Sequence, residues 1–230
     1  MRLLAREVGV ELSSPLSLPD LSSPAVARLA LDACSATPAI VRRDRAVLTM
    51  GLAAASRRRS LSEFDVADAT MTSEGLLLEF RRTKTEPRTV DLREVGGRYC
   101  PVVNLREWLA CYEELAGRPL LGRDPLFPRL DRHGNLQLDA DGAHARLSQA
   151  AFSDIVRRRA EQAGLVGRYR SHSLRRRFAT TLARKKVPLE KIARRGGWKS
   201  LDVVWGYIEE AGWFEEDWSC ALGLDELDAG

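Results

Sequence analysis

The stretch from Ser171 to Tyr207 constrains the fold of this chain more than any other. His172 is followed three residues later by Arg175, so a helix that begins there places both side chains on one face. Helix-like runs, a Gly196-Gly197-Trp198 break and the single Tyr207 come after them. An arginine holds phosphate oxygens with two hydrogen bonds, an imidazole moves a proton near neutral pH, and a tyrosine can act as a nucleophile. The set therefore suits phosphate chemistry.

These residues also carry a family resemblance. In order and spacing, His172-x-x-Arg175, Gly-Gly-Trp198 and Tyr207 resemble the C-terminal signature of the tyrosine recombinases, the phage integrase family. Trp198 stands where that family has His or Trp. An isolated H-x-x-R is common in helices, but the ordered set is specific. The resemblance covers about residues 38–208 and implies an α+β fold that is mainly α-helical, with a small antiparallel β-sheet.

Two upstream motifs fill the remaining positions of the family pattern. Residues 42–55 have the composition of a buried helix, and Arg57 follows them as the first catalytic arginine that the resemblance implies. Strand-like runs at 76–80 and 89–92 flank a polar turn with Lys84-Thr85-Glu86, where the family carries its catalytic lysine. The resemblance thus implies a catalytic set made of Arg57, Lys84, His172, Arg175, Trp198 and Tyr207.

The reaction that the resemblance implies is a transesterification of DNA without metal, ATP or any other cofactor. Tyr207 attacks the scissile phosphate and leaves a 3′-phosphotyrosyl link and a free 5′-hydroxyl. Such a transfer depends on positioning and on neutralisation of charge. Arg57 and Arg175 are expected to hold the non-bridging oxygens. The product would be a recombined DNA, as in a site-specific recombinase or integrase.

The other implied residues handle protons and one hydrogen bond. Trp198 can donate its indole N–H to the phosphate but cannot accept a proton. His172 is the candidate general base or orienting donor for a phenol whose ordinary pKa is about 10. Lys84 is the candidate general acid for the departing 5′-oxygen, which leaves poorly unless it is protonated.

The charge distribution agrees with a nucleic-acid partner. The net charge is +4, although the last residues from 209 to 228 are acidic, so the rest of the chain is more basic than the total. We expect double-stranded DNA as the partner, and the resemblance implies a homo-oligomer, a tetramer, on paired DNA sites. The candidate DNA-binding residues are Arg58, Arg59, Arg82, Arg176, Arg177 and Lys199.

Cysteine usage and hydropathy point to the cytoplasm. The 4 cysteines are scattered without metal-ligand spacing, which predicts reduced thiols and no metal site. No apolar run approaches the length of a membrane span, and the N-terminus lacks the apolar region of a secretory signal. A cytoplasmic, nucleoid-associated protein is therefore expected.

Three segments are predicted along the chain. Residues 1–36 form an N-terminal segment with a Ser/Pro-rich linker and a helix over 24–34, residues 37–208 form the recombinase catalytic domain, and residues 209–230 form an acidic amphipathic tail. About 37 residues precede the first motif, too few for the N-terminal clamping domain of the family. Positions 214, 218 and 222 recur on one helix face. In an isolated monomer this face would pack on the chain's own core, whereas the resemblance implies docking on a neighbouring protomer, which we expect in the DNA-bound assembly.

Further elements are expected between the motifs. Helices are predicted over 101–115, 147–163, 173–185, 188–194 and 199–207, and a short strand at Leu126-Phe127. Trp108 belongs to the apolar stripe of the first of these helices and is expected in the core. His133 and His144 have no partner at ligand spacing and are expected on the surface.

Other functions remain open from the sequence. The family usually has Glu three residues after its first arginine, where this chain has Ser60, and Glu63 on the next turn could replace it. Ser60 favours a catalytically impaired DNA-binding relative with an architectural or regulatory role. A type IB topoisomerase-like enzyme would share the chemistry, but Trp198 and the hairpin fit a recombinase better. A general basic module that binds RNA is the weakest alternative.

Overall fold

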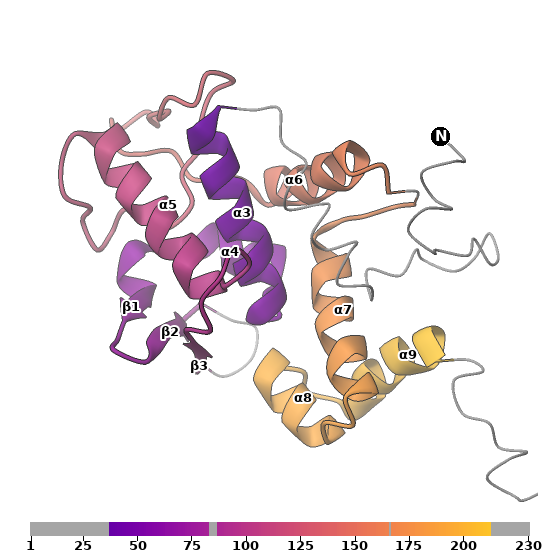
Figure 1. The fold of residues 1–230 in the computed structure, drawn as a ribbon. Helices are drawn as coiled ribbons and strands as arrows, with labels where there is room; N and C mark the ends of the chain where they lie inside the picture. Colours follow the sequence, from indigo (N-terminus) through magenta and orange to yellow (C-terminus); the bar gives the residue numbers. More distant parts are fainter. Residues whose placement is uncertain (1–36, 83–86, 166, 213–230) are drawn as a thin grey trace, which may run out of the picture.

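The computed structural model describes residues 37–82, 87–165 and 167–212. Seven α-helices, a short 3-10 helix and three strands form there, which confirms the predicted mainly α-helical α+β fold (Figure 1). The helices and strands are α3 (Pro38–Ala53), α4 (Arg58–Glu63), η1 (Val66–Asp68), β1 (Ala69–Met71), β2 (Gly75–Phe80), β3 (Arg88–Arg93), α5 (Pro101–Ala116), α6 (Gln149–Gln162), α7 (Ser171–Arg184), α8 (Leu189–Gly196) and α9 (Leu201–Gly212). The predicted helix over 24–34 and the tail face at 214, 218 and 222 lie outside the described residues.

The larger of two apolar cores lies among α3, α5, α6 and the sheet. Both α3 and α5 begin with proline, whose fixed φ suits a first turn and whose missing N–H costs nothing there. Trp108 is fully buried in this core, as predicted, and its indole N–H donates to the carbonyl of Leu126 at 2.9 Å. A buried ion pair between Arg159 on α6 and Asp44 on α3, at 2.8 Å, joins two helices of this part.

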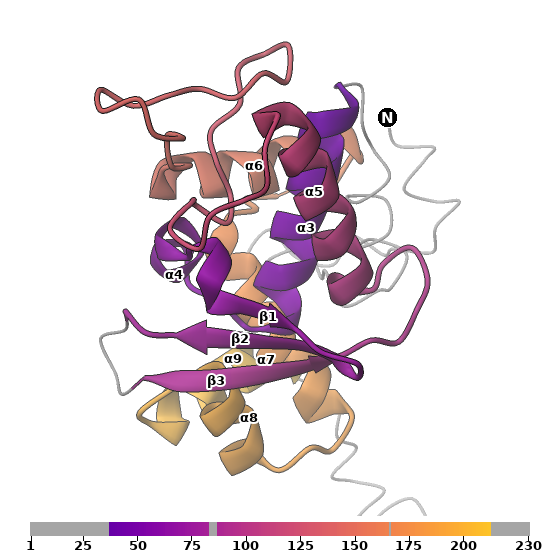
Figure 2. The same cartoon turned by 90° about the vertical axis from the view of Figure 1, so that its left-hand side faces the viewer.

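The sheet is an antiparallel meander in the order β1-β2-β3 (Figure 2). The register pairs Leu76 with Leu92 and Leu78 with Val90, and these four side chains are buried on one face. Leu77, which alternates with them, is exposed, as the period of two in a strand requires. The strand pair predicted at 76–80 and 89–92 is therefore confirmed, and it places β3 at the edge next to α8 (Figure 2).

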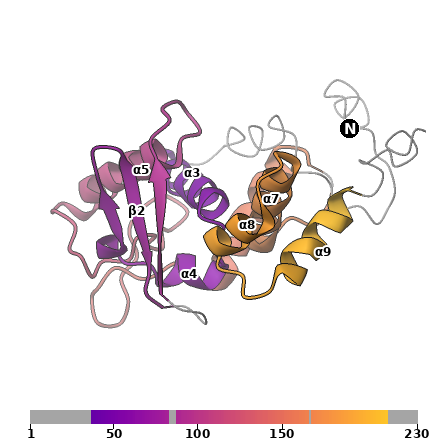
Figure 3. The ribbon, with the colours of Figure 1, turned by 90° about the horizontal axis from the view of Figure 1, so that it is seen from below.

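The smaller core lies among α7, α8 and α9. Buried Phe178, Ile192 and Val204 come one from each of these helices, and Ala55 from the end of the α3 region joins them. Figure 3 shows α3 between the sheet and this helical group. The group therefore faces both the α3–α4 connection and the edge of the sheet, and the residues predicted to be functional meet at this junction.

Two local predictions are wrong. The run at Leu126-Phe127 is buried but forms no strand, because only its neighbours Pro125 and Pro128 make isolated bridges, to Asp65 and Arg146 respectively. His144 is not a surface residue: its side chain is 9 % exposed, and its Nδ1 lies 2.6 Å from the hydroxyl of buried Tyr112. In both cases a long-range contact that leaves no periodic trace in the sequence decides the structure.

Candidate active site

Arg175 is the centre of the candidate site. It lies on the first turns of α7, is 2 % exposed, and its Nη1 donates to the carbonyl of Ala55 at 2.5 Å and of Gly196 at 2.6 Å. The guanidinium therefore holds together α7, the α3–α4 connection and the end of α8. Its Nη2 is buried and has no hydrogen-bond partner. Nη1 of Arg175 thus stabilises the fold, and Nη2 keeps its N–H groups available for a ligand.

The connection between α3 and α4 makes the first of these contacts possible. The helix predicted over 42–55 ends at Ala53, and Ala55 has a φ of 48°, a left-handed conformation that is unfavourable for alanine. Full burial of Ala55 in the smaller core holds it there. Its carbonyl faces Arg175, and the chain then continues through Arg57, which is extended, exposed and caps the start of α4.

The Gly196-Gly197 pair places Trp198 against Arg175. A Cβ atom on Gly196 would overlap the Trp198 ring, and Gly197 has a φ of 63°, which favours glycine. The Trp198 ring lies 3.8 Å from the Arg175 guanidinium carbon and stacks on Phe178 with centroids 6.4 Å apart. Position 196 therefore needs a glycine because the indole packs on its backbone, and position 197 needs one because of its φ.

Tyr207 and His172 meet directly. The Tyr207 hydroxyl lies 2.9 Å from His172 Nε2, and the two rings pack edge to face with centroids 5.8 Å apart. Tyr207 comes from α9 and His172 from the first turn of α7, which begins at Ser171, slightly earlier than predicted. Trp198 also packs edge to face on Tyr207, at 6.1 Å. The phenol is thus oriented by an imidazole that can take its proton.

Positively charged side chains surround His172 and Arg175 and contribute to lowering the pKa of both groups. Burial lowers the pKa of His172, and the neighbouring charges of Arg175, Arg176 and Arg57 lower it further. Burial, helped by Arg57 and Arg88, lowers the pKa of Arg175 to about 9. At neutral pH the arginines stay charged and His172 is neutral, so the imidazole is free to act as a proton acceptor while the guanidiniums attract an anion.

The structure brings together five of the six predicted catalytic residues. Arg175, Trp198, Tyr207 and His172 are in contact with one another, and Arg57 is close enough to shift the pKa of both His172 and Arg175. Lys84 lies outside the described residues. The roles of these residues remain predictions.

The predicted DNA-binding residues differ in their exposure and in their contacts with other side chains. Arg58 and Lys199 are exposed, Arg59 pairs with Glu63 at 2.8 Å, and the guanidinium carbon of Arg176 lies 5.5 Å from the centre of the Tyr207 ring. Arg177 is half-buried on α7. These placements do not decide which of them bind DNA.

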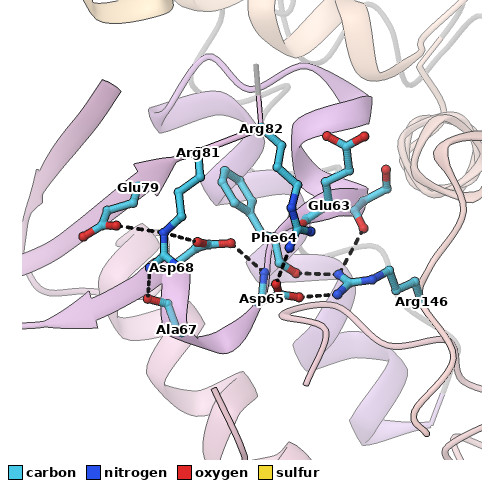
Figure 4. Close-up of polar contacts among 10 residues, drawn as sticks. Glu63, Phe64, Asp65, Ala67, Asp68, Glu79, Arg81, Arg82 and Arg146 are labelled. Atoms are coloured by element: carbon cyan, nitrogen blue, oxygen red, sulfur yellow. Dashed lines mark hydrogen bonds and ion pairs between the residues drawn. The ribbon is translucent and has the colours of Figure 1, made fainter. Parts of the chain in front are cut away.

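Arg82 is part of a fixed ion-pair network at the end of β2 (Figure 4). It donates to Asp65 at 3.0 Å and to the carbonyl of Glu63 at 2.9 Å, and Arg146 approaches Asp65 from the other side. In the same figure Arg81 reaches Asp68 at 3.0 Å. A DNA contact by Arg82 would therefore have to compete with, or extend, an existing pair.

Glu63, which the sequence suggests as a replacement for the family's glutamate, lies at the end of α4. Ser60 and Glu63 line one small pocket together with Phe80 and Arg82, at the end of β2. One carboxylate oxygen of Glu63 accepts from Arg59, and the other is buried without a hydrogen-bond partner. That Glu63 replaces the family's glutamate stays a prediction, and the unpaired oxygen of Glu63 agrees with it.

Sequence reasoning missed one basic residue of the site, Arg88, at the start of β3. Its guanidinium carbon lies 3.8 Å from the centre of the Phe80 ring, and a Cβ on Gly197 would lie 2.5 Å from its Nη1. Farther along β3, Asp91 binds Arg195 of α8 at 2.5 Å. In the sequence Arg88 is only the last residue of a polar turn, and nothing there indicates its distant partners.

Comparisons with known proteins show the family of this chain. The model of the phage integrase family matches residues 24–212. An integrase/recombinase XerD homolog from Selenomonas ruminantium is 28 % identical over 182 residues, which are 76 % of this chain and 49 % of the relative. The chain thus spans about half the length of the curated relative it matches.

Solved structures give the same fold at low sequence identity. The XerH site-specific recombinase bound to palindromic difH substrate, in a post-cleavage complex, has a TM-score of 0.63 and 22 % identity, covering 90 % of this chain and 57 % of that one. A lambda integrase tetramer bound to a Holliday junction has a TM-score of 0.54 and 16 % identity, covering 85 % of this chain and 50 % of that one. With the family model matched over most of its length, the chain belongs to the phage integrase family.

Proposed function

We propose that this chain is the catalytic part of a site-specific DNA recombinase or integrase that cuts and rejoins DNA through a 3′-phosphotyrosyl intermediate. The observation that carries the proposal is the contact between the Tyr207 hydroxyl and His172 Nε2 at 2.9 Å, beside the buried guanidinium of Arg175. A nucleophile, a base and a phosphate-binding fork thus lie together. Membership of the phage integrase family supports the same reaction.

The roles follow from the atoms that each side chain offers. Tyr207 gives its proton to neutral His172 as its oxygen attacks phosphorus, and the 5′-oxygen leaves with the electrons of the broken bond. The free donors of Arg175, with Arg57, hold the non-bridging oxygens, where negative charge is greatest. Trp198 adds its indole N–H. Lys84 is proposed to protonate the leaving oxygen, and Glu63 to support the site in place of the glutamate that Ser60 replaces.

The partner we propose is double-stranded DNA, on which copies of this chain assemble as a tetramer on paired sites. The XerH structure contains its DNA substrate and the lambda integrase structure is a tetramer on a Holliday junction, and both share this fold. Such a protein would act in the cytoplasm, at the nucleoid. None of the helices in the described ranges is long and apolar enough to cross a membrane.

A nicked suicide DNA substrate tests the proposal, because loss of the short 5′-fragment traps the covalent intermediate. The parent should form an adduct at the 3′ side of the break, and Tyr207→Phe should bind the DNA equally well and form none. Binding without an adduct by the parent would identify the DNA-binding relative instead. Relaxation of supercoiled DNA without strand exchange would identify a topoisomerase-like enzyme.

A further inference from the structure

Arg88 is a charged side chain that no role assigned so far explains. It is partly enclosed between the Phe80 ring and the backbone of Gly197, and its Nε is buried without a hydrogen-bond partner. Within the described part of the chain, no carboxylate pairs with it. A partly buried cation without a counter-ion is unfavourable, because it loses part of its hydration and gains no partner.

The neighbours of Arg88 make this charge still less favourable. Burial, together with the positive charges of Arg57 and Arg195, lowers its pKa to about 10. Arg88 in turn lowers the pKa of Arg175. Arg57, Arg88 and Arg175 therefore share one electrostatic environment, from three separate elements, with the same sign of charge. Such an arrangement is stabilised by an anion bound among them.

The contacts of Arg88 with its neighbours do not require a charged side chain. The contact with Phe80 needs a cation or any flat side chain, and the close approach to Gly197 needs only an extended one. By contrast, Asp91 and Arg195 already bind β3 to α8 with an ion pair. What a guanidinium adds at the start of β3 is a set of hydrogen-bond donors close enough to Arg57 and Arg175 for the charges to interact.

We propose that Arg88 is a third phosphate-binding arginine of this site and donates hydrogen bonds to a backbone phosphate of the bound DNA beside the oxygens held by Arg57 and Arg175. The proposal rests on the proposed function for the identity of the ligand. The proposal also gives a second reason for glycine at position 197, because any side chain there would occupy the place of the Arg88 guanidinium.

The test measures DNA affinity in the Tyr207→Phe background, so that no cleavage interferes. The probes are duplexes in which one phosphate at a time around the cleavage point is replaced by an uncharged methylphosphonate. Arg88→Met keeps the packing on Phe80 and removes the charge. On unmodified DNA it should weaken binding by about 10-fold to 100-fold, the effect of a lost hydrogen bond to a charged group. That penalty should disappear on the one duplex that lacks the contacted charge.

Two controls make the result specific. Arg93→Met alters an exposed arginine on the same strand. Any effect of this change on DNA affinity should be the same on every duplex, whichever phosphate is replaced. Arg88→Lys keeps the charge without the planar fork and should retain the coupling to the same phosphate with weaker affinity. The position of the coupled phosphate tells whether Arg88 holds the scissile phosphate or an adjacent one.

The stability of the DNA-free protein separates binding from positioning. If Arg88 serves a ligand, Arg88→Met should unfold at the same or a higher denaturant concentration than the parent, because a repelled cation is removed. An equal loss of affinity on every duplex, together with a loss of stability, would overturn the proposal in favour of a structural role. Because no readout requires a covalent adduct, this result is independent of whether the parent cleaves DNA.

Discussion

At the scale of single residues, the site depends on how each polar atom is shared between structure and ligand. Arg175 uses Nη1 for two carbonyls and leaves Nη2 unpaired, so one side chain both closes the fold and presents a donor. His172 contacts the Tyr207 hydroxyl through Nε2, and burial together with the surrounding cations lowers its pKa.

The first prediction concerns the titration of His172. Burial and the charges of Arg175, Arg176 and Arg57 all disfavour the imidazolium, so His172 should titrate below its usual value of about 6.5 and be neutral at pH 7. NMR titration of the histidine ring protons can measure this, since the chain has 3 histidines and His172→Gln identifies the resonance.

The same spectra test the cause of the shift. Arg57→Gln removes one of the repelling charges and should raise the pKa of His172 in the free protein. Binding of uncleaved DNA should also raise it, because the phosphate offsets the arginines. A His172 that titrates at or above its usual value in the free protein would contradict the electrostatic account.

At the scale of elements, the sequence predicts most of the helices and strands but not the connections between them. The helix expected over 101–115 and the strand pair at 76–80 and 89–92 appear almost as predicted, because strong periodicity defines them. The helix expected over 42–55 ends early, since Ala55 turns its carbonyl toward Arg175 far along the chain. Such connections depend on tertiary contacts that no local pattern records.

The candidate site shows the same difference between what sequence patterns predict and what tertiary contacts decide. The order and spacing of the sequence motifs name a set of candidate catalytic residues, whose roles stay predictions, and the structure places the described ones near one another. Arg88 could not be predicted, because its contacts with Phe80 and Gly197 appear only when β3 lies beside the end of α8. The alternative position of the carboxylate, Glu63, could be named from the sequence, but its buried, unpaired oxygen could not.

The second prediction uses the glycine at the end of α8. Gly196→Ala introduces a methyl group into the space of the Trp198 ring, so the indole must move away from Arg175. We expect a loss of about 1–3 kcal/mol in the free energy of unfolding, as for overpacked cores. We also expect a loss of DNA cleavage that exceeds any loss of binding. Denaturant unfolding and the suicide-substrate assay measure the two effects.

The matched control is Gly206→Ala on α9. No atom lies within 4 Å of a Cβ built on Gly206, so the change meets open space. Alanine favours a helix interior over glycine by about 0.8–1 kcal/mol, and stability should rise by up to that amount. If both glycine variants behaved alike, the packing explanation for Gly196 would be wrong.

At the scale of the whole molecule, the number of basic residues overstates the charge available to DNA. The Arg157–Arg159 cluster on α6 is an example, because Arg157 pairs with Glu161 at 3.0 Å and Arg159 is buried against Asp44. The exposed cations near the candidate site are different. Arg58 and Lys199 have no carboxylate partner in the described ranges and flank the predicted catalytic residues.

The last prediction is that a few site arginines and lysines, and not the total charge of +4, set the salt dependence of DNA binding. Each phosphate contact releases counterions and steepens the fall of log affinity with log salt by about 0.9. Arg58→Gln and Lys199→Gln should therefore each reduce the slope by about that amount, whereas Arg157→Gln should leave it unchanged because Glu161 already neutralises that arginine. Fluorescence anisotropy at several salt concentrations measures the slopes. Equal reductions in all three variants would mean that DNA responds to the overall charge of the chain and not to the surface around the Tyr207 hydroxyl.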